Sequence, residues 1–114
     1  MSNPRPGRPV RHSKTGRPIM ALLDLLGRRW TLRVLWELRA PVPTFRALQA
    51  QCHGMSSSVL SQRLAELTEA GIVAARPAGG YTLTAEGEAL LAALGPLDQW
   101  AQRWADRVQR SDRR

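Results

Sequence analysis

The stretch from Ser56 to Gly71 has the most regular pattern of apolar and polar positions in the chain. Leucines recur there at positions i, i+4 and i+7 and form one apolar stripe: Leu60, Leu64 and Leu67. Ser56 precedes the stripe and is a candidate cap, because a serine hydroxyl accepts a free backbone N–H of the first helical turn. The pattern predicts an amphipathic helix over residues 56–70 whose outer face is polar and uncharged.

The chain ahead of this stretch predicts three shorter helices. Residues 19–26 are apolar on nearly all sides except at Asp24, which predicts a helix buried both by its own domain and by a partner. Residues 30–39 predict a second helix with an inward-facing apolar set: Leu32, Leu35, Trp36 and Leu38. Thr44 is a candidate cap for a third helix that ends near Cys52.

The pattern after Gly71 predicts a hairpin and then a long helical region. Residues 72–76 and 80–84 predict two strands, and Thr84 caps a helical region that runs to about Val108. Apolar positions in that region recur at alternating steps of four and three, like a coiled-coil seam: Leu90, Leu94, Leu97, Ala101, Trp104 and Val108. The Gly95-Pro96 pair predicts a kink or a break within it.

These elements predict an α+β, mostly helical fold: a winged helix-turn-helix with a short two-stranded wing and dimerisation helices at both ends. A helix with a polar outer face followed by a hairpin is how such a domain presents itself to the DNA major groove. We divide the chain into a disordered basic arm (1–18), a DNA-binding and dimerisation domain (19–110) and a frayed tail (111–114). The helix taken alone is equally consistent with an outer face that is merely solvated.

Composition favours a polyanionic partner. The formal net charge is +8 over 114 residues, but Arg5, Arg8, Arg11, Lys14 and Arg17 all lie in the arm, which holds no acidic residue. No apolar run approaches the ~18 residues of a membrane span, so we expect no membrane partner and a cytoplasmic, nucleoid-associated protein. The single cysteine rules out an intrachain disulfide and suits a reducing compartment.

Short sequence blocks stand in a characteristic order along residues 19–104. They are Leu26-Gly27-Arg28-Arg29-Trp30-Thr31, Thr44-Phe45-Arg46-Ala47-Leu48, Gly54-Met55-Ser56, Val59-Leu60-Ser61-Gln62-Arg63-Leu64, Ala70-Gly71-Ile72-Val73, Tyr81-Thr82-Leu83-Thr84 and Trp100-Ala101. As an ensemble they resemble the HxlR family of bacterial transcriptional regulators. The resemblance implies a sequence-specific DNA-binding regulator, most simply a repressor, that acts as a homodimer with helix 56–70 in the major groove and has no enzymatic activity.

The chain departs from the family pattern in three places. Many members carry a redox-sensing cysteine where Arg17 precedes Pro18, so sensing by that route is not expected here. The wing is cut to residues 77–79, which leaves Arg76 as its one cation. Ser58 stands where the family often has a lysine or an arginine, so phosphate contact there is weaker.

Candidate contact residues follow from the pattern and the resemblance together. Base contacts are assigned to Ser57, Ser58, Ser61 and Gln62, because glutamine can bind adenine through N6 and N7 together and serine adapts to several bases. Phosphate contacts are assigned to Arg28, Arg29, Thr44, Arg46, Ser56, Arg63 and Arg76. For Arg63, pairing with an acid such as Glu66 or Asp24 is an equal alternative. The dimer interface is assigned to Met20, Leu23, Leu97, Trp100, Trp104 and Val108.

Other kinds of site find little support in the sequence. Cys52 lies on an apolar helix face, which predicts a buried, inert thiol, and with His12 and His53 it lacks the ligand spacing of a metal site. No serine has a histidine–acid partner set, so neither catalysis nor a cofactor is expected. A pocket for an unknown small-molecule effector between the first and last helices is left open. The alternative function is a winged helix that binds proteins and no specific DNA.

Overall fold

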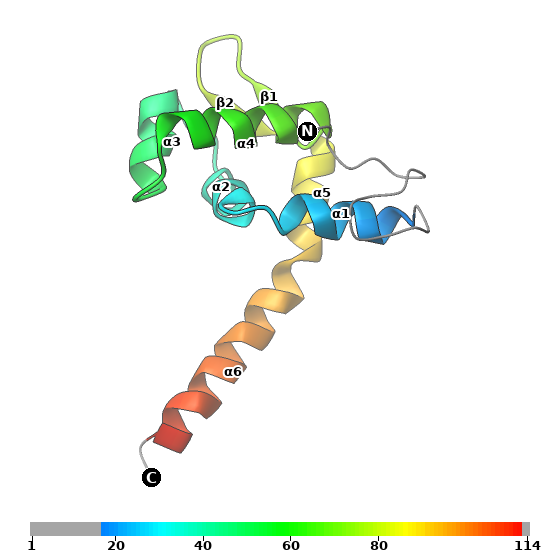
Figure 1. Ribbon diagram of the computed structural model, residues 1–114, viewed down its shortest axis with the longest axis vertical. Coiled ribbons are helices and arrows are strands. Elements are labelled where there is room, and N and C mark those ends of the chain that lie inside the picture. Colours follow the sequence, from blue (N-terminus) through cyan, green and yellow to red (C-terminus); the bar gives the residue numbers. More distant parts are fainter. Residues whose placement is uncertain (1–16, 113–114) are drawn as a thin grey trace.

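The computed structural model describes residues 17–112. Within that range the chain forms six helices and one two-stranded sheet (Figure 1). In chain order they are α1 (Pro18–Leu26), α2 (Thr31–Glu37), α3 (Phe45–Gln51), α4 (Ser57–Glu69), β1 (Val73–Ala75), β2 (Tyr81–Leu83), α5 (Ala85–Ala93) and α6 (Gly95–Asp112). The predicted fold class, mostly helical with a small wing, is confirmed.

Side-chain caps start three of these helices where the sequence predicts them. Thr44, Ser56 and Thr84 precede α3, α4 and α5, and each hydroxyl accepts the backbone N–H three residues later, at 3.0, 3.2 and 3.1 Å. Each cap satisfies a donor that the helix itself leaves unpaired. The caps fix where these helices begin, including the helix predicted to read DNA.

The core lies beneath α4. Its leucine stripe is buried at 0–3% exposure and packs with side chains from α1, α2, α3 and the hairpin: Leu25, Leu26, Val34, Leu35, Leu38, Leu48, Ile72, Val73 and Leu83. The predicted inward face of α2 is only half right, since Leu32 and Trp36 are 47% and 44% exposed and Val34 is buried instead. Leu32 and Trp36 stand four residues apart and line a hollow against α6, so α2 has apolar side chains on two faces.

The hairpin is short and is fixed to the loop after α2. Val73 pairs with Leu83 and Ala75 with Tyr81 in an antiparallel ladder, so each strand is shorter than predicted. Tyr81 also exchanges two backbone hydrogen bonds with Val42, at 3.0 and 3.1 Å. A Cβ atom at Gly80 would lie 2.0 Å from the Val42 carbonyl oxygen, so only glycine permits this approach. These contacts hold the base of the wing to the domain.

The two ends of the described chain differ from the predicted domain boundaries. Pro18 is the first residue of α1, and residues 1–16 of the predicted arm lie outside the described residues. Helix α6 continues through Asp112, so Ser111 and Asp112 are helical where a frayed tail is predicted. The break at Gly95-Pro96 is confirmed: α5 ends at Ala93, and α6 then extends away from the body (Figure 1). Among residues 17–112, no helix has both the length and the apolar character to cross a membrane.

Candidate nucleic-acid interface

The outer face of α4 is a continuous polar surface. The residues assigned to base contacts, Ser57, Ser58, Ser61 and Gln62, are all exposed, while the leucine stripe on the other side is buried. Ala65 is exposed on the next turn, and sequence reasoning missed it. Hydroxyls, one amide and a methyl group are able to contact base edges by hydrogen bonds and by apolar contact with thymine. This face is available to a partner because no described side chain covers it.

Two of the assigned phosphate contacts are helix caps. The Thr44 and Ser56 hydroxyls accept backbone N–H groups of α3 and α4, and both residues are exposed. The Ser56 Oγ also lies 3.3 Å from the Ser58 Oγ. A hydroxyl that accepts a cap bond still has its own proton to donate, so capping and phosphate binding are compatible.

Two of the assigned arginines have free access to solvent. Arg46, in the first turn of α3, is exposed and forms no ion pair within residues 17–112. Arg29 is exposed in the α1–α2 turn, and its guanidinium lies 5.3 Å from the Trp30 ring centroid. Arg76 is half-buried, and its backbone pairs with Gly80 at the base of the wing. These side chains place positive charge on the α1–α2 turn, the first turn of α3 and the base of the wing.

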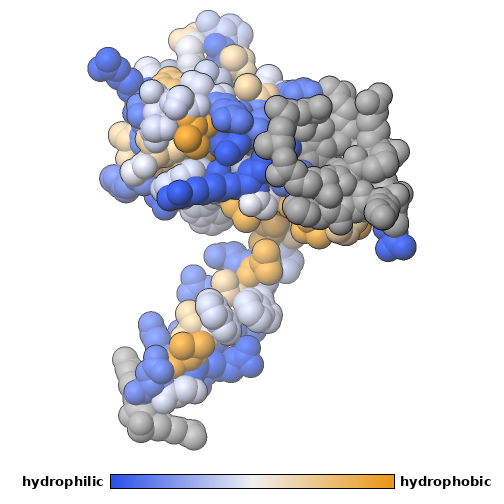
Figure 2. All heavy atoms as spheres, viewed as in Figure 1, coloured by the Kyte–Doolittle hydropathy of each residue, from blue (hydrophilic) through white to orange (hydrophobic). Residues whose placement is uncertain are grey.

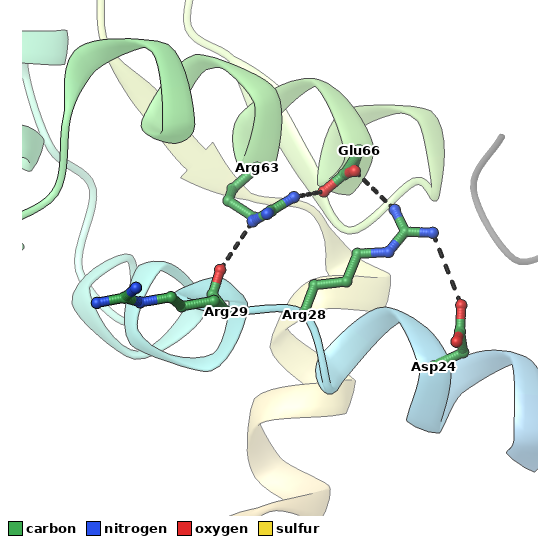
Figure 3. A network of polar contacts seen from close by, with 5 residues as sticks. All are labelled: Asp24, Arg28, Arg29, Arg63 and Glu66. Atoms are coloured by element: carbon green, nitrogen blue, oxygen red, sulfur yellow. Dashed lines mark hydrogen bonds and ion pairs between the residues drawn. The ribbon is translucent and has the colours of Figure 1, made fainter. Parts of the chain in front are cut away.

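Arg28 and Arg63 instead meet at one carboxylate (Figure 3). Arg28 Nη1 donates to Glu66 Oε2 at 2.7 Å, and Arg63 Nη1 donates to Glu66 Oε1 at 2.6 Å. Arg63 Nε also donates to the carbonyl oxygen of Arg29 at 2.8 Å, and Arg28 lies 3.7 Å from Asp24. We call these five residues the Glu66 network. The side chains that form its ion pairs are only 12–23% exposed.

The Glu66 network changes the interpretation of two assigned residues. Of the two alternatives open for Arg63, the structure shows pairing with Glu66. The assignment of Arg28 to phosphate did not foresee its pairing, although its spacing of four residues from Asp24 is a sequence signal for an ion pair. Phosphate binding by Arg28 and Arg63 stays a prediction, and it competes with these contacts.

Apolar side chains are exposed on the two helices assigned to dimerisation. On α6, Leu97, Trp100, Trp104 and Val108 are 44–59% exposed, and Figure 2 shows apolar surface along this helix. The Trp100 and Trp104 rings stack with centroids 5.9 Å apart. On α1, Leu23 is exposed and Met20 half-buried, and the equally exposed Ile19 was not among the assigned residues. Water therefore reaches the faces that the sequence predicts for an interface.

The remaining candidates lie outside the polar face of α4. Cys52 is fully buried, as predicted, and burial raises the pKa of its thiol, with a further contribution from the charge of Glu37. A hollow of about 250 Å³ beside α6 is lined by α2 residues such as Leu32 and Trp36, and not by α1 as the predicted effector pocket would be. It is bounded by apolar side chains and the carboxylate of Asp98.

Known proteins with similar sequences are transcriptional regulators. The model of the HxlR-like helix-turn-helix family matches residues 25–109. The HTH-type transcriptional regulator YvaP of Bacillus subtilis is 32% identical over 90 residues, which cover 74% of this chain and 83% of YvaP. The HTH-type transcriptional regulator Rv3095 of Mycobacterium tuberculosis is 34% identical over 104 residues, but the match spans only 65% of Rv3095.

Solved structures show the same arrangement of elements. Quinone-bound YodB from B. subtilis matches with a TM-score of 0.68 and 30% identity, over 75% of this chain and 96% of YodB. A regulator described as a MarR family member from Enterococcus faecalis V583 matches with a TM-score of 0.70 and 27% identity, over 89% of this chain and 97% of that one. The fold of this chain thus occurs in solved structures of bacterial transcriptional regulators.

Proposed function

The chain belongs to the HxlR-like helix-turn-helix family of transcriptional regulators, and from that membership we propose that it acts as a homodimeric repressor that reads double-stranded DNA with α4. The observation that carries the proposal is the exposed polar face of α4 above a fully buried leucine stripe. A helix of this kind can enter the major groove without losing any core contact. Repression is the simplest outcome, because a bound dimer blocks polymerase sterically.

In this proposal Gln62 and Ser61 read bases, with Ser57 and Ser58 beside them. Gln62 has both a donor and an acceptor, which match N7 and the N6 amino group of adenine. The serine hydroxyls can donate to or accept from several bases, so they add contacts with less discrimination. Sequence preference should therefore depend mostly on Gln62.

Phosphate binding falls chiefly to Arg29 and Arg46, with Arg76, Thr44 and Ser56 at the margins of the face. Arg29 and Arg46 are exposed, and each adds a full charge that releases counterions on binding DNA. Arg28 and Arg63 have a smaller part here because a carboxylate already lies between them. The net charge of +8 raises affinity for any sequence.

Dimerisation would use the exposed apolar faces of α1 and α6. A two-fold dimer places two recognition helices in successive major grooves, about 34 Å apart. It also hides tryptophan and leucine side chains that are about half exposed in the single chain. We place the protein in the cytoplasm with the nucleoid and give it no enzymatic activity. An effector, if the protein has one, would be a small molecule of unknown identity.

Selection of DNA by the purified protein tests the proposal directly. We expect enrichment of one inverted-repeat motif from a random 40-base-pair pool, and a shift of the DNA upstream of the protein's own gene at nanomolar concentration. A scrambled fragment of equal length should shift only at much higher concentration. Equal affinity for all fragments would favour the alternative, a winged helix that binds protein, and would overturn the proposed function.

A further inference from the structure

The Glu66 network joins the two helices on which the proposed function depends. Asp24 belongs to α1, Arg28 and Arg29 to the turn that follows it, and Arg63 and Glu66 to α4. Helix α1 carries exposed apolar side chains of the proposed interface, and α4 carries the polar face. Figure 3 shows the network between α4 and the α1–α2 turn. Its bonds therefore run from the dimerisation side of the domain to the reading helix.

We propose that Glu66, bridging Arg28 and Arg63, is a positioning residue that fixes α4 relative to α1 and thereby sets the spacing of the two DNA half-sites. The inference rests on the proposed function and identifies a residue that controls how the two reading helices of the dimer are placed. Glu66 is suited to the task because each carboxylate oxygen receives one arginine, so its position is constrained from both elements. The Arg63 bond to the Arg29 carbonyl adds a third link at 2.8 Å.

The electrostatics of the network favour a fixed position of α4 relative to the α1–α2 turn. Its ion-paired side chains are mostly shielded from water, so salt screens these pairs less than surface pairs. Removal of the Glu66 charge would leave two arginines facing each other without a carboxylate between them. Like charges repel, so Arg28 and Arg63 would separate, and α4 would be held less firmly against α1 and the turn that follows it.

DNA geometry makes such a loss measurable. Each base pair added between the two half-sites increases their separation by about 3.4 Å and rotates one half-site relative to the other by about 34° around the DNA axis. A dimer with rigidly held reading helices tolerates one spacing, whereas a dimer with loosened helices adapts to several. The preference for one spacing thus reports helix positioning separately from base recognition.

A matched ion pair elsewhere in the chain provides the control. Arg33 and Glu37 pair at 2.8 Å, and Glu37 is 15% exposed against 12% for Glu66. Both partners lie within α2, so their pair does not join α1 to α4. Glu37→Gln and Glu66→Gln remove the same charge at similar burial and differ in what the pair connects.

The experiment uses the full chain and the motif selected by the wild type. Two inverted copies of the half-site are placed at the selected spacing and at spacings one and two base pairs longer and shorter. For wild type and Glu37→Gln, we expect affinity to fall about tenfold for one base pair of change, the scale of a single mismatch. For Glu66→Gln and Arg28→Gln, it should fall less than about threefold, with the half-site sequence unchanged.

The outcomes separate this inference from the function on which it rests. Failure of the wild type to enrich any motif overturns the proposed function. A motif without a preferred spacing, or Glu66→Gln and Arg28→Gln profiles as steep as the wild type, overturns the positioning role alone. A uniform loss of affinity at every spacing in Arg28→Gln would mark that residue as a phosphate contact and also contradict the inference. The inference would also be contradicted if Glu37→Gln flattened the dependence of affinity on spacing equally, or if both network variants were unfolded at the assay temperature.

Discussion

Helices α4 and α6 have the same kind of sequence pattern, but the apolar face of α4 is buried and that of α6 is exposed. Each has apolar side chains at helical spacing on one side and polar side chains on the other. The leucine stripe of α4 is at most 3% exposed. On α6 no residue is buried, and its large apolar side chains are 44–59% exposed. An amphipathic pattern thus predicts that a face needs covering, but not what covers it.

The difference comes from where each helix lies. Helix α4 crosses the body and packs on α2 and β1, so its own chain supplies the cover. Helix α6 begins at Gly95, after the break that follows α5, and leaves the body, so its outer turns have no neighbour within residues 17–112 (Figure 1). If a second copy of the chain packs on α6, substitutions on α6 will weaken dimerisation, whereas substitutions in the leucine stripe of α4 will weaken folding of the single chain.

The largest effect is expected at Trp104. Trp104→Glu places a charge from each copy within the proposed seam, and an uncompensated buried charge should weaken association about 1,000-fold or more. Sedimentation velocity at micromolar concentration should then show monomers, with poor binding to the selected DNA. Gln102→Glu, exposed on the opposite side of α6, is the control and should stay dimeric. A Trp104→Glu protein that sediments as a dimer would refute this interface.

Leu64→Ala should lower the free energy of unfolding by about 2–5 kcal/mol, because it opens a cavity beneath α4. Urea denaturation should show this loss equally at every protein concentration, since the cover of Leu64 is intramolecular. Leu97→Ala on α6 should instead lower the free energy of unfolding only at protein concentrations where the wild type is dimeric. An equal, concentration-independent loss for Leu97→Ala would remove the distinction between the helices.

On the outer face of α4, Gln62→Ala should cost about 1–3 kcal/mol of affinity for the selected site and relax discrimination at one base position. Arg46→Ala should weaken all sequences alike and reduce the slope of log affinity against log salt by about one. Fluorescence anisotropy with matched and mismatched duplexes measures both. Unchanged specificity in Gln62→Ala would mean that another face of α4 reads the DNA.

The start of α4 offers a comparison between adjacent serines. Ser56 caps the helix and Ser57 does not, although both are exposed. Ser56→Ala should destabilise the protein by about 1 kcal/mol, and Ser57→Ala by less than about 0.5 kcal/mol. Thermal denaturation of both variants at one concentration measures the difference. Equal losses would contradict the assignment of the cap.

The smallest effect concerns Cys52, which reports how well the interior behind α4 excludes water. Burial raises the pKa of its thiol, so the unfolded chain loses this proton at a lower pH than the folded one. Stability from this group is therefore complete below the ordinary thiol pKa of about 8.5 and falls as pH rises above it. The free energy of unfolding of Cys52→Ala should therefore fall less steeply at alkaline pH than that of the wild type. In the wild type, a thiol reagent should react slowly with Cys52 until urea is added. Fast labelling of the native protein would contradict the buried assignment.

The sequence predicted most of the elements because each has a local physical cause. The caps at Thr44, Ser56 and Thr84 and the break at Gly95-Pro96 depend on groups within a few residues of one another. It misjudged Leu32 and Trp36, because spacing within a short helix cannot tell a core face from a second apolar face. It also left the role of Arg63 open, since charge alone does not distinguish a phosphate contact from an ion pair.

By itself, the sequence determined the order of the helices, the leucine stripe and polar face of α4, and the family to which these blocks point. Hydrogen bonds to neighbouring residues and the period of a helix act over short stretches, so they can be read along the chain. Only the tertiary structure decided that Glu66 faces both Arg28 and Arg63, that the wing is fixed to Val42, and that no residue of α6 is buried within the described chain. These facts depend on residues far apart in sequence meeting in space, and side-chain spacing does not specify such meetings.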